Sequence, residues 1–85
     1  MIQWILDAAW QENGHEYQVY ALRTDEVCIH NSLAAVWLFD GKATDAQISK
    51  SKWGYGYTTL FTVKGMQIEE AKGYLETLLR MEGKL

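Results

Sequence analysis

Two residues with reactive side chains lie close together in the chain, Cys28 and His30. On a strand, residues two apart project to the same face, so the thiol would lie beside the imidazole. Such a pair is either an activated nucleophile or half of a metal site. Structural zinc requires four Cys or His ligands, and only His15 could add to this pair. We therefore expect an inert buried cysteine, no bound metal and no cofactor, and we rank a Cys/His-dependent enzyme last among the possible functions.

A segment with the chemistry to bind single-stranded nucleic acid runs over residues 50–57, Lys-Ser-Lys-Trp-Gly-Tyr-Gly-Tyr. Lysines bind phosphates, aromatic rings stack on bases, and glycines allow close backbone approach. The stretch Gly54–Tyr57 resembles the centre of the RNP1 motif of RNA-recognition and cold-shock domains. The resemblance implies a set of base-stacking rings and phosphate-binding ammonium groups, which are Lys50, Lys52, Trp53, Tyr55 and Tyr57.

The same segment departs from the RNP1 pattern at three positions. Trp53 stands where a basic residue precedes the first glycine, Thr58 replaces an aliphatic residue, and Leu60 occupies the place of the third aromatic. No strand resembling RNP2 is evident near the N-terminus. Single-strand nucleic-acid binding is therefore the second-ranked function, and a glycine-punctuated turn that enters a strand is the preferred interpretation.

A third group of residues could form a surface for a protein partner. Tyrosine and tryptophan are enriched where proteins meet, because each offers a large rigid contact area with one polar atom. The chain contains four Trp, five Tyr and two Phe, more rings than a core of this size needs to enclose. We predict a partner-binding surface of aromatic and acidic residues formed by Trp10, Tyr17, Glu12, Glu16, Asp25 and Glu26.

The charge distribution favours that surface over general binding to nucleic acid. Residues 1–40 carry six carboxylates and the single cation Arg23, whereas residues 41–85 carry seven cations and five carboxylates. A phosphate backbone requires a basic face, and the net charge of the chain is −3. An acidic half instead suits a basic partner surface.

Length and composition limit the remaining possibilities. A chain of 85 residues supports one domain, here residues 1–85, with one core. The lone Cys28 fits a reducing, cytoplasmic compartment. No apolar run approaches the length of a membrane-spanning helix, and residues 1–10 lack a basic start and a cleavage site, so we expect a soluble protein without a membrane partner.

Hydrophobic periodicity predicts mainly strands in the first half of the chain. Alternation over Ile2–Trp10 favours a strand over the alternative helix, because Asn13-Gly14 is a strong hairpin turn and a second alternating run follows over Tyr17–Leu22. We expect a further hairpin limb at Val27–His30. The apolar run Leu33–Phe39 is compatible with a strand or a short helix, and its strand-forming residues favour the strand.

The second half predicts a turn, a strand and a helix. Asp40-Gly41 suits a type I′ turn, residues 43–56 indicate a polar loop or a ragged strand, and Tyr57–Val63 a strand. Ile68, Ala71, Leu75, Leu78 and Leu79 recur at helical spacing. The predicted fold is α+β, a meander-like antiparallel sheet of four or five strands with one C-terminal amphipathic helix on one face. Excess aromatics would gather on the other face.

The leading functional prediction is a small non-catalytic protein-interaction module. No catalytic or cofactor motif is evident, and the aromatic and acidic residues fit a partner of basic surface. The chain looks like the compact inhibitors and adaptors that phages and mobile elements encode. Edge strands without proline also make a homodimer a reasonable expectation.

Overall fold

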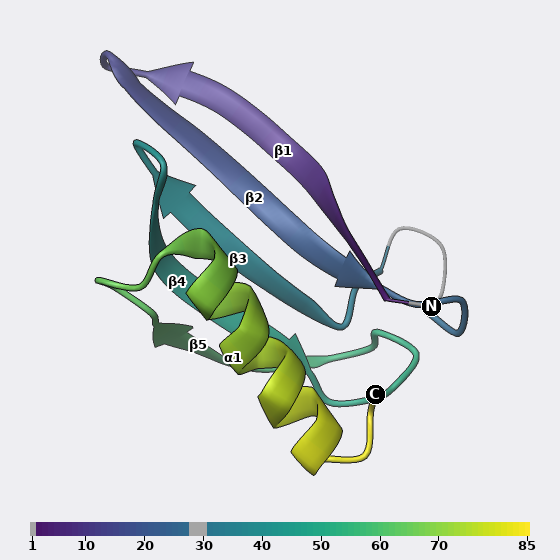
Figure 1. Cartoon of the computed structure of the whole chain (residues 1–85). Helices are drawn as coiled ribbons and strands as arrows, with labels where there is room; N and C mark the ends of the chain where they lie inside the picture. The colour runs from purple at the N-terminus through teal and green to yellow at the C-terminus, as the bar shows by residue number, and fades with distance from the viewer. Residues whose placement is uncertain (1, 28–30) are drawn as a thin grey trace.

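The computed structural model describes the backbone of residues 2–27 and 31–85, and the side chains of these residues apart from 57–61. Five strands form one antiparallel sheet in the order β1-β2-β3-β4-β5, so that each strand pairs with its neighbours in sequence. A single helix, α1, covers one face of this sheet across β3 and β4 (Figure 1). The predicted α+β meander with a C-terminal helix is confirmed.

The first three strands are explained by the Asn13-Gly14 turn between β1 and β2 and by the apolar run that forms β3. The strands are β1 (Gln3–Glu12), β2 (His15–Arg23) and β3 (Ala34–Phe39). Asn13 and Gly14 have φ values of 53° and 77°, and positive φ at both central residues is what a type I′ hairpin turn requires. The apolar run that was compatible with helix or strand is therefore the strand β3, buried along most of its length.

The expected limb at Val27–His30 is not confirmed. Val27 lies in a turn after β2, closed by its N–H donating to the carbonyl of Thr24 at 3.2 Å, and Cys28, Ile29 and His30 lie outside the described residues. Val27 is buried against the core instead of pairing in the sheet. Val27 thus anchors a turn to the core. A single buried valine gives the same short-range apolar pattern in a turn as in a strand, so the sequence alone does not distinguish the two.

The region 43–56 divides into an irregular strand and a loop. β4 (Lys42–Ser49) pairs with β3 after the Asp40-Gly41 turn, whose φ values are 49° and 80°, and β5 (Tyr57–Thr62) pairs with β4. Of the two alternatives predicted for residues 43–56, the ragged strand is confirmed for 43–49 and the loop for 50–56. A register shift between Trp37 and Leu38 of β3 interrupts the pairing, and the buried apolar residues of β4 therefore lie at 43, 46 and 48 instead of alternating strictly.

The helix α1 (Ile68–Met81) buries a stripe formed by Ala71, Leu75 and Leu79. It ends in a Schellman motif: Gly83 has φ 75°, its N–H donates to the carbonyl of Arg80, and the N–H of Lys84 donates to that of Leu79. No helix in the described part of the chain is long and apolar enough to cross a membrane.

The core lies between α1 and one face of the sheet. Its largest fully buried members come from strand, loop and helix alike, namely Leu22, Leu33, Val36, Val63, Leu75 and Leu79. Trp4 ties β1 to the helix, because its indole Nε1 donates to Glu76 Oε2 at 3.0 Å and the ammonium of Lys72 lies 5.7 Å from its ring centre. Within residues 2–27 and 31–85, no helix covers the opposite face of the sheet (Figure 1).

Candidate functional site

An aromatic cluster occupies one end of the uncovered face, where β1, β2 and β3 lie side by side. Trp10 pairs with Tyr17 across β1 and β2, and Tyr17 pairs with Phe39 across β2 and β3. The rings of Trp10 and Tyr17 stack at 5.2 Å with an angle of 6° between their planes, and Tyr17 meets Phe39 edge-on at 5.3 Å. We call these three residues and His15, whose ring lies 4.7 Å from that of Phe39, the aromatic cluster.

The Asp40 carboxylate holds the hairpin that carries this cluster. One oxygen accepts the backbone N–H of Glu16 at 2.8 Å, and the other lies 2.8 Å from Nδ1 of His15. Because an ionised carboxylate only accepts hydrogen bonds, Nδ1 is the protonated nitrogen of His15. The Glu16 N–H, followed by the hydrogen bond from His15, lowers the pKa of Asp40 below its ordinary value. The β3–β4 turn is thereby tied to the start of β2.

Packing differs between the two faces of the sheet. Val19, Ala21 and Ala35 are buried, yet they do not belong to the core beneath α1. They share their face with the aromatic cluster through strand alternation and register. Trp10 and Phe39 remain 42% and 37% exposed. This face thus has an apolar floor shielded by neighbouring side chains and, at one end, large rings that solvent reaches. The predicted collection of aromatics on the uncovered face accounts for Trp10, Tyr17 and Phe39.

The predicted acidic residues do not form one surface. Glu12 and Glu16 lie at the β1–β2 hairpin, where Glu12 pairs with His15, and they flank the aromatic cluster. Asp25 and Glu26 follow the far end of β2, in a molecule 39 Å long. Residues 17–23 of β2 and Thr24 lie between the two pairs, and the strand part alone spans about 23 Å. The expectation of a single acidic face containing all four residues is therefore wrong, and only the Glu12 and Glu16 pair accompanies Trp10 and Tyr17.

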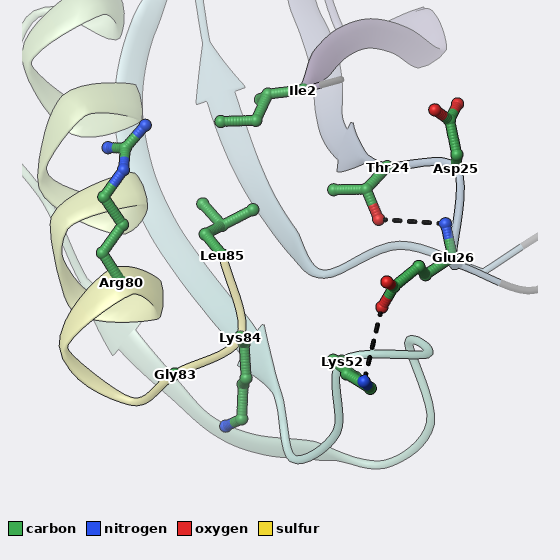
Figure 2. Close-up of a pocket in the computed structure, with 9 residues that line it drawn as sticks. All are labelled: Ile2, Thr24, Asp25, Glu26, Lys52, Arg80, Gly83, Lys84 and Leu85. Atoms are coloured by element: carbon green, nitrogen blue, oxygen red, sulfur yellow. Dashed lines mark hydrogen bonds and ion pairs between the residues drawn. The ribbon is translucent and has the colours of Figure 1, made fainter.

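Asp25 and Glu26 instead line a pocket of about 540 Å³ at the opposite end of the molecule (Figure 2). The pocket lies between the turn after β2, the loop after β4 and the C-terminal segment, and its charged walls also include Lys52, Arg80 and Lys84. Glu26 Oε2 lies 3.7 Å from the ammonium of Lys52. The other cations have partners too: Arg80 pairs with Glu76, and Lys84 with Glu82 and the carbonyl of Ser49. These charges already have partners within the chain.

The segment 50–56 is a closed loop rather than a stacking platform on the sheet. Ser49 Oγ donates to the carbonyl of Tyr55 at 2.9 Å, and Ser51 Oγ accepts the N–H of Tyr55 at 3.1 Å. Gly54 has φ 90°, and a Cβ at this position would lie 2.9 Å from side-chain atoms of Asn31 and Val27. The glycine is thus required by close packing against the preceding loop.

Of the five candidate nucleic-acid residues, two present exposed rings. Trp53 and Tyr55 are 49% and 59% exposed, and both lie in the loop rather than on a strand face. Lys52 lies 5.3 Å from the ring centre of Trp53 while also pairing with Glu26, and the Lys50 side chain packs along Gly56. Tyr57 begins β5, and its side chain lies outside the described residues. The expected RNP1-like stacking pair is Tyr55 and Tyr57, and because the side chain of Tyr57 is not described, this pair stays a prediction.

Cys28 and His30 lie outside the described residues, so the thiol–imidazole pair has no structural account. In the part of the chain that is described, no three His, Cys, Asp or Glu side chains come together as potential metal ligands. Sequence reasoning missed Phe39, His15 and Asp40 as parts of the aromatic end. Counting outward from the Asn13-Gly14 turn places Trp10 opposite Tyr17, but the pairing of Tyr17 with Phe39 depends on how β3 aligns after a long connection.

Comparison with known proteins adds no relationship: no protein family model, no curated protein and no solved structure matches this chain.

Proposed function

We propose that this chain is a non-catalytic protein-interaction module that binds a protein partner through the aromatic cluster and the neighbouring carboxylates of Glu12 and Glu16. The observation that carries the proposal is the stack of Trp10 on Tyr17 with Phe39 beside it, on a face without a helix. Rings held by one another lose little conformational entropy on binding, and such residues dominate the energetics of protein interfaces.

The flanking carboxylates indicate the charge of the partner. Glu12 and Glu16 are exposed, and no lysine or arginine pairs with either of them in the described part of the chain. An acidic rim around an apolar centre favours a partner with a basic rim, and it raises the rate of association. A small acidic module of this kind fits an inhibitor or adaptor of the type that phages and mobile elements encode, acting in the cytoplasm on a basic protein surface. A second copy of the chain is an alternative partner.

The experiment compares two half-exposed tryptophans at opposite ends of the molecule. The protein, immobilised, is exposed to nuclease-treated lysate of the source organism, and any protein it retains is purified and its affinity measured directly. Trp10→Ala should weaken binding at least roughly 30-fold, as expected for a central aromatic hot spot, while Trp53→Ala should leave the affinity unchanged. Equal affinities of the two variants would contradict the proposed surface.

Single-strand nucleic-acid binding remains the second candidate because Trp53 and Tyr55 are exposed on one loop. It predicts the reverse pattern: retention lost on nuclease treatment, steep weakening with salt, and sensitivity to Tyr55→Ala with Tyr57→Ala rather than to Trp10→Ala. The pairing of Lys52 with Glu26 removes one of the cations that this candidate requires.

A further inference from the structure

A second cavity, separate from the pocket in Figure 2, lies between the β3–β4 hairpin and the connection from β5 to α1. Its volume is about 380 Å³, within the range of small-molecule sites in proteins. Three of its lining residues are apolar: Phe39 from the end of β3, Ala43 from β4, and Met66 just before α1. Ala43 is buried, and Met66 packs against the core. The cavity thus offers an apolar floor that is continuous with the interior.

Two lysines line the same cavity, Lys42 at the start of β4 and Lys64 after β5. Four other cations of the described chain, Lys52, Lys72, Arg80 and Lys84, each lie within 4 Å of a carboxylate. Lys50, outside the cavity, has no such pair among the described residues. No described carboxylate pairs with the ammonium of Lys42 or Lys64, and both lysines are exposed. Two cations without an acidic partner therefore border one apolar cavity.

The start of α1 contributes little net charge to this site. Gln67, which also lines the cavity, is the N-cap residue and makes no side-chain hydrogen bond to the helix. The free N–H groups of a first turn carry partial positive charge, but Glu69 and Glu70 in that turn offset it. The two ammonium groups therefore determine the charge that the cavity attracts.

We propose that this cavity binds an amphiphilic carboxylate, with its acid group between Lys42 and Lys64 and its apolar body against Ala43 and Met66. Hydrogen bonds to a charged group are stronger than neutral ones, and removing the apolar body from water supplies the remaining affinity. A purely apolar ligand would leave the two cations unused, and a small inorganic anion would leave the apolar floor in water. The site does not depend on the protein partner proposed above.

The test uses three probes that separate the head from the tail: octanoate, 1-octanol and acetate, added to the full chain at pH 7. Two-dimensional amide NMR follows which residues shift, and the titration gives the dissociation constant. We expect octanoate to bind at one site, with saturable shifts at Ala43, Gly65 and Met66, and at least roughly 10-fold more tightly than either of the other probes. Its affinity should fall as salt rises from 50 to 500 mM.

Matched variants assign the charge to these two lysines. Lys42→Met with Lys64→Met keeps the aliphatic stems and should weaken octanoate binding about 10-fold or more without changing that of octanol. Lys50→Met, an exposed lysine outside the cavity, is the control and should bind octanoate like the original chain. Equal binding of octanoate and octanol, an unaffected double variant, or saturable shifts located only elsewhere would each overturn the proposal. If the double variant fails to fold, the comparison of the three probes and the salt dependence of octanoate binding still test the proposal on the original chain.

Discussion

The two ends of the sheet differ in how their surface groups are partnered. At the β1–β2 hairpin end, the aromatic cluster presents rings that contact one another on one side and solvent on the other. At the end that carries the loop 50–56, Glu26, Lys52 and Lys84 have charged partners within the chain. A surface whose groups already pair internally gains little from a partner, because binding must first break those pairs. The aromatic end retains most of its capacity to interact.

The largest expected effect is on the free energy of unfolding, when a glycine at either end of the sheet is replaced by alanine. Gly54→Ala should lower the free energy of unfolding by about 2–3 kcal/mol, because the new Cβ would overlap Asn31 and Val27 at a backbone position with φ 90°. Gly14→Ala at the hairpin, where φ is 77° but no atom lies within 4 Å of the Cβ position, should cost only about 1 kcal/mol. Urea unfolding followed by fluorescence measures both. Equal losses would show that the loop is not the more tightly packed end.

The next effect is on partner binding, once a protein partner is purified. Glu12→Lys with Glu16→Lys should weaken affinity by roughly 10-fold, mainly through slower association that depends on salt. Asp25→Lys with Glu26→Lys carries the same charge change at the other end and should leave the affinity unaltered, while separating Lys52 from its partner. Association rates at two salt concentrations distinguish the cases. A larger loss from the second variant would move the interface to the pocket of Figure 2.

The next prediction concerns the stability of the helix α1, which lies between the two ends of the sheet. Gly73→Ala should stabilise the protein by about 0.5–1 kcal/mol, since no atom lies within 4 Å of the new Cβ and alanine favours the helix. It should leave affinity for the partner unchanged. The measurement is the urea midpoint, and a decrease would indicate a close contact at this position that the structure does not contain.

The smallest effect is pH-dependent and belongs to the aromatic end. The pKa of Asp40 is lower in the folded protein than its ordinary value of 3.8, so its contribution to stability is present above that pH and is lost as pH falls through the folded pKa. Asp40→Asn keeps a residue that tolerates the positive φ of the turn. The variant should be less stable than the original chain at pH 6, and the difference should shrink as the pH falls below 3.8 and through the folded pKa of Asp40. A difference independent of pH would assign the effect to the turn instead.

The sequence predicted the fold better than it predicted the site, for physical reasons that individual residues make clear. Asn13-Gly14 and Asp40-Gly41 specify tight hairpins locally, and the stripe Ala71, Leu75 and Leu79 specifies the helix face. For β4 the sequence left a loop and a ragged strand open, because a register shift breaks the alternation of its residues.

The candidate site depends on the distances in space between its residues, which cannot be read from their separation in the sequence. Glu16 lies near the start of β2, and Asp25 follows its last residue, Arg23. The seven steps from Glu16 to Arg23 would span about 10 Å in a helix and span about 23 Å in this strand. Phe39 reaches Tyr17 only through the β2–β3 register, which the long connection between the two strands does not specify. The acidic and aromatic residues were therefore recognisable as candidates for an interface, but their division between two ends was not.

The strand order has a consequence for how the chain reaches this structure. Each strand pairs only with strands adjacent in sequence, so every hairpin can form from local contacts, and such contacts favour rapid folding. The bond from Trp4 to Glu76 is different, because it closes a separation of 72 residues. It can form only after the helix exists and has docked on the sheet. β1 is thus joined to α1 only once the helix has docked, and until then, among the described elements, β3 holds the β1–β2 hairpin.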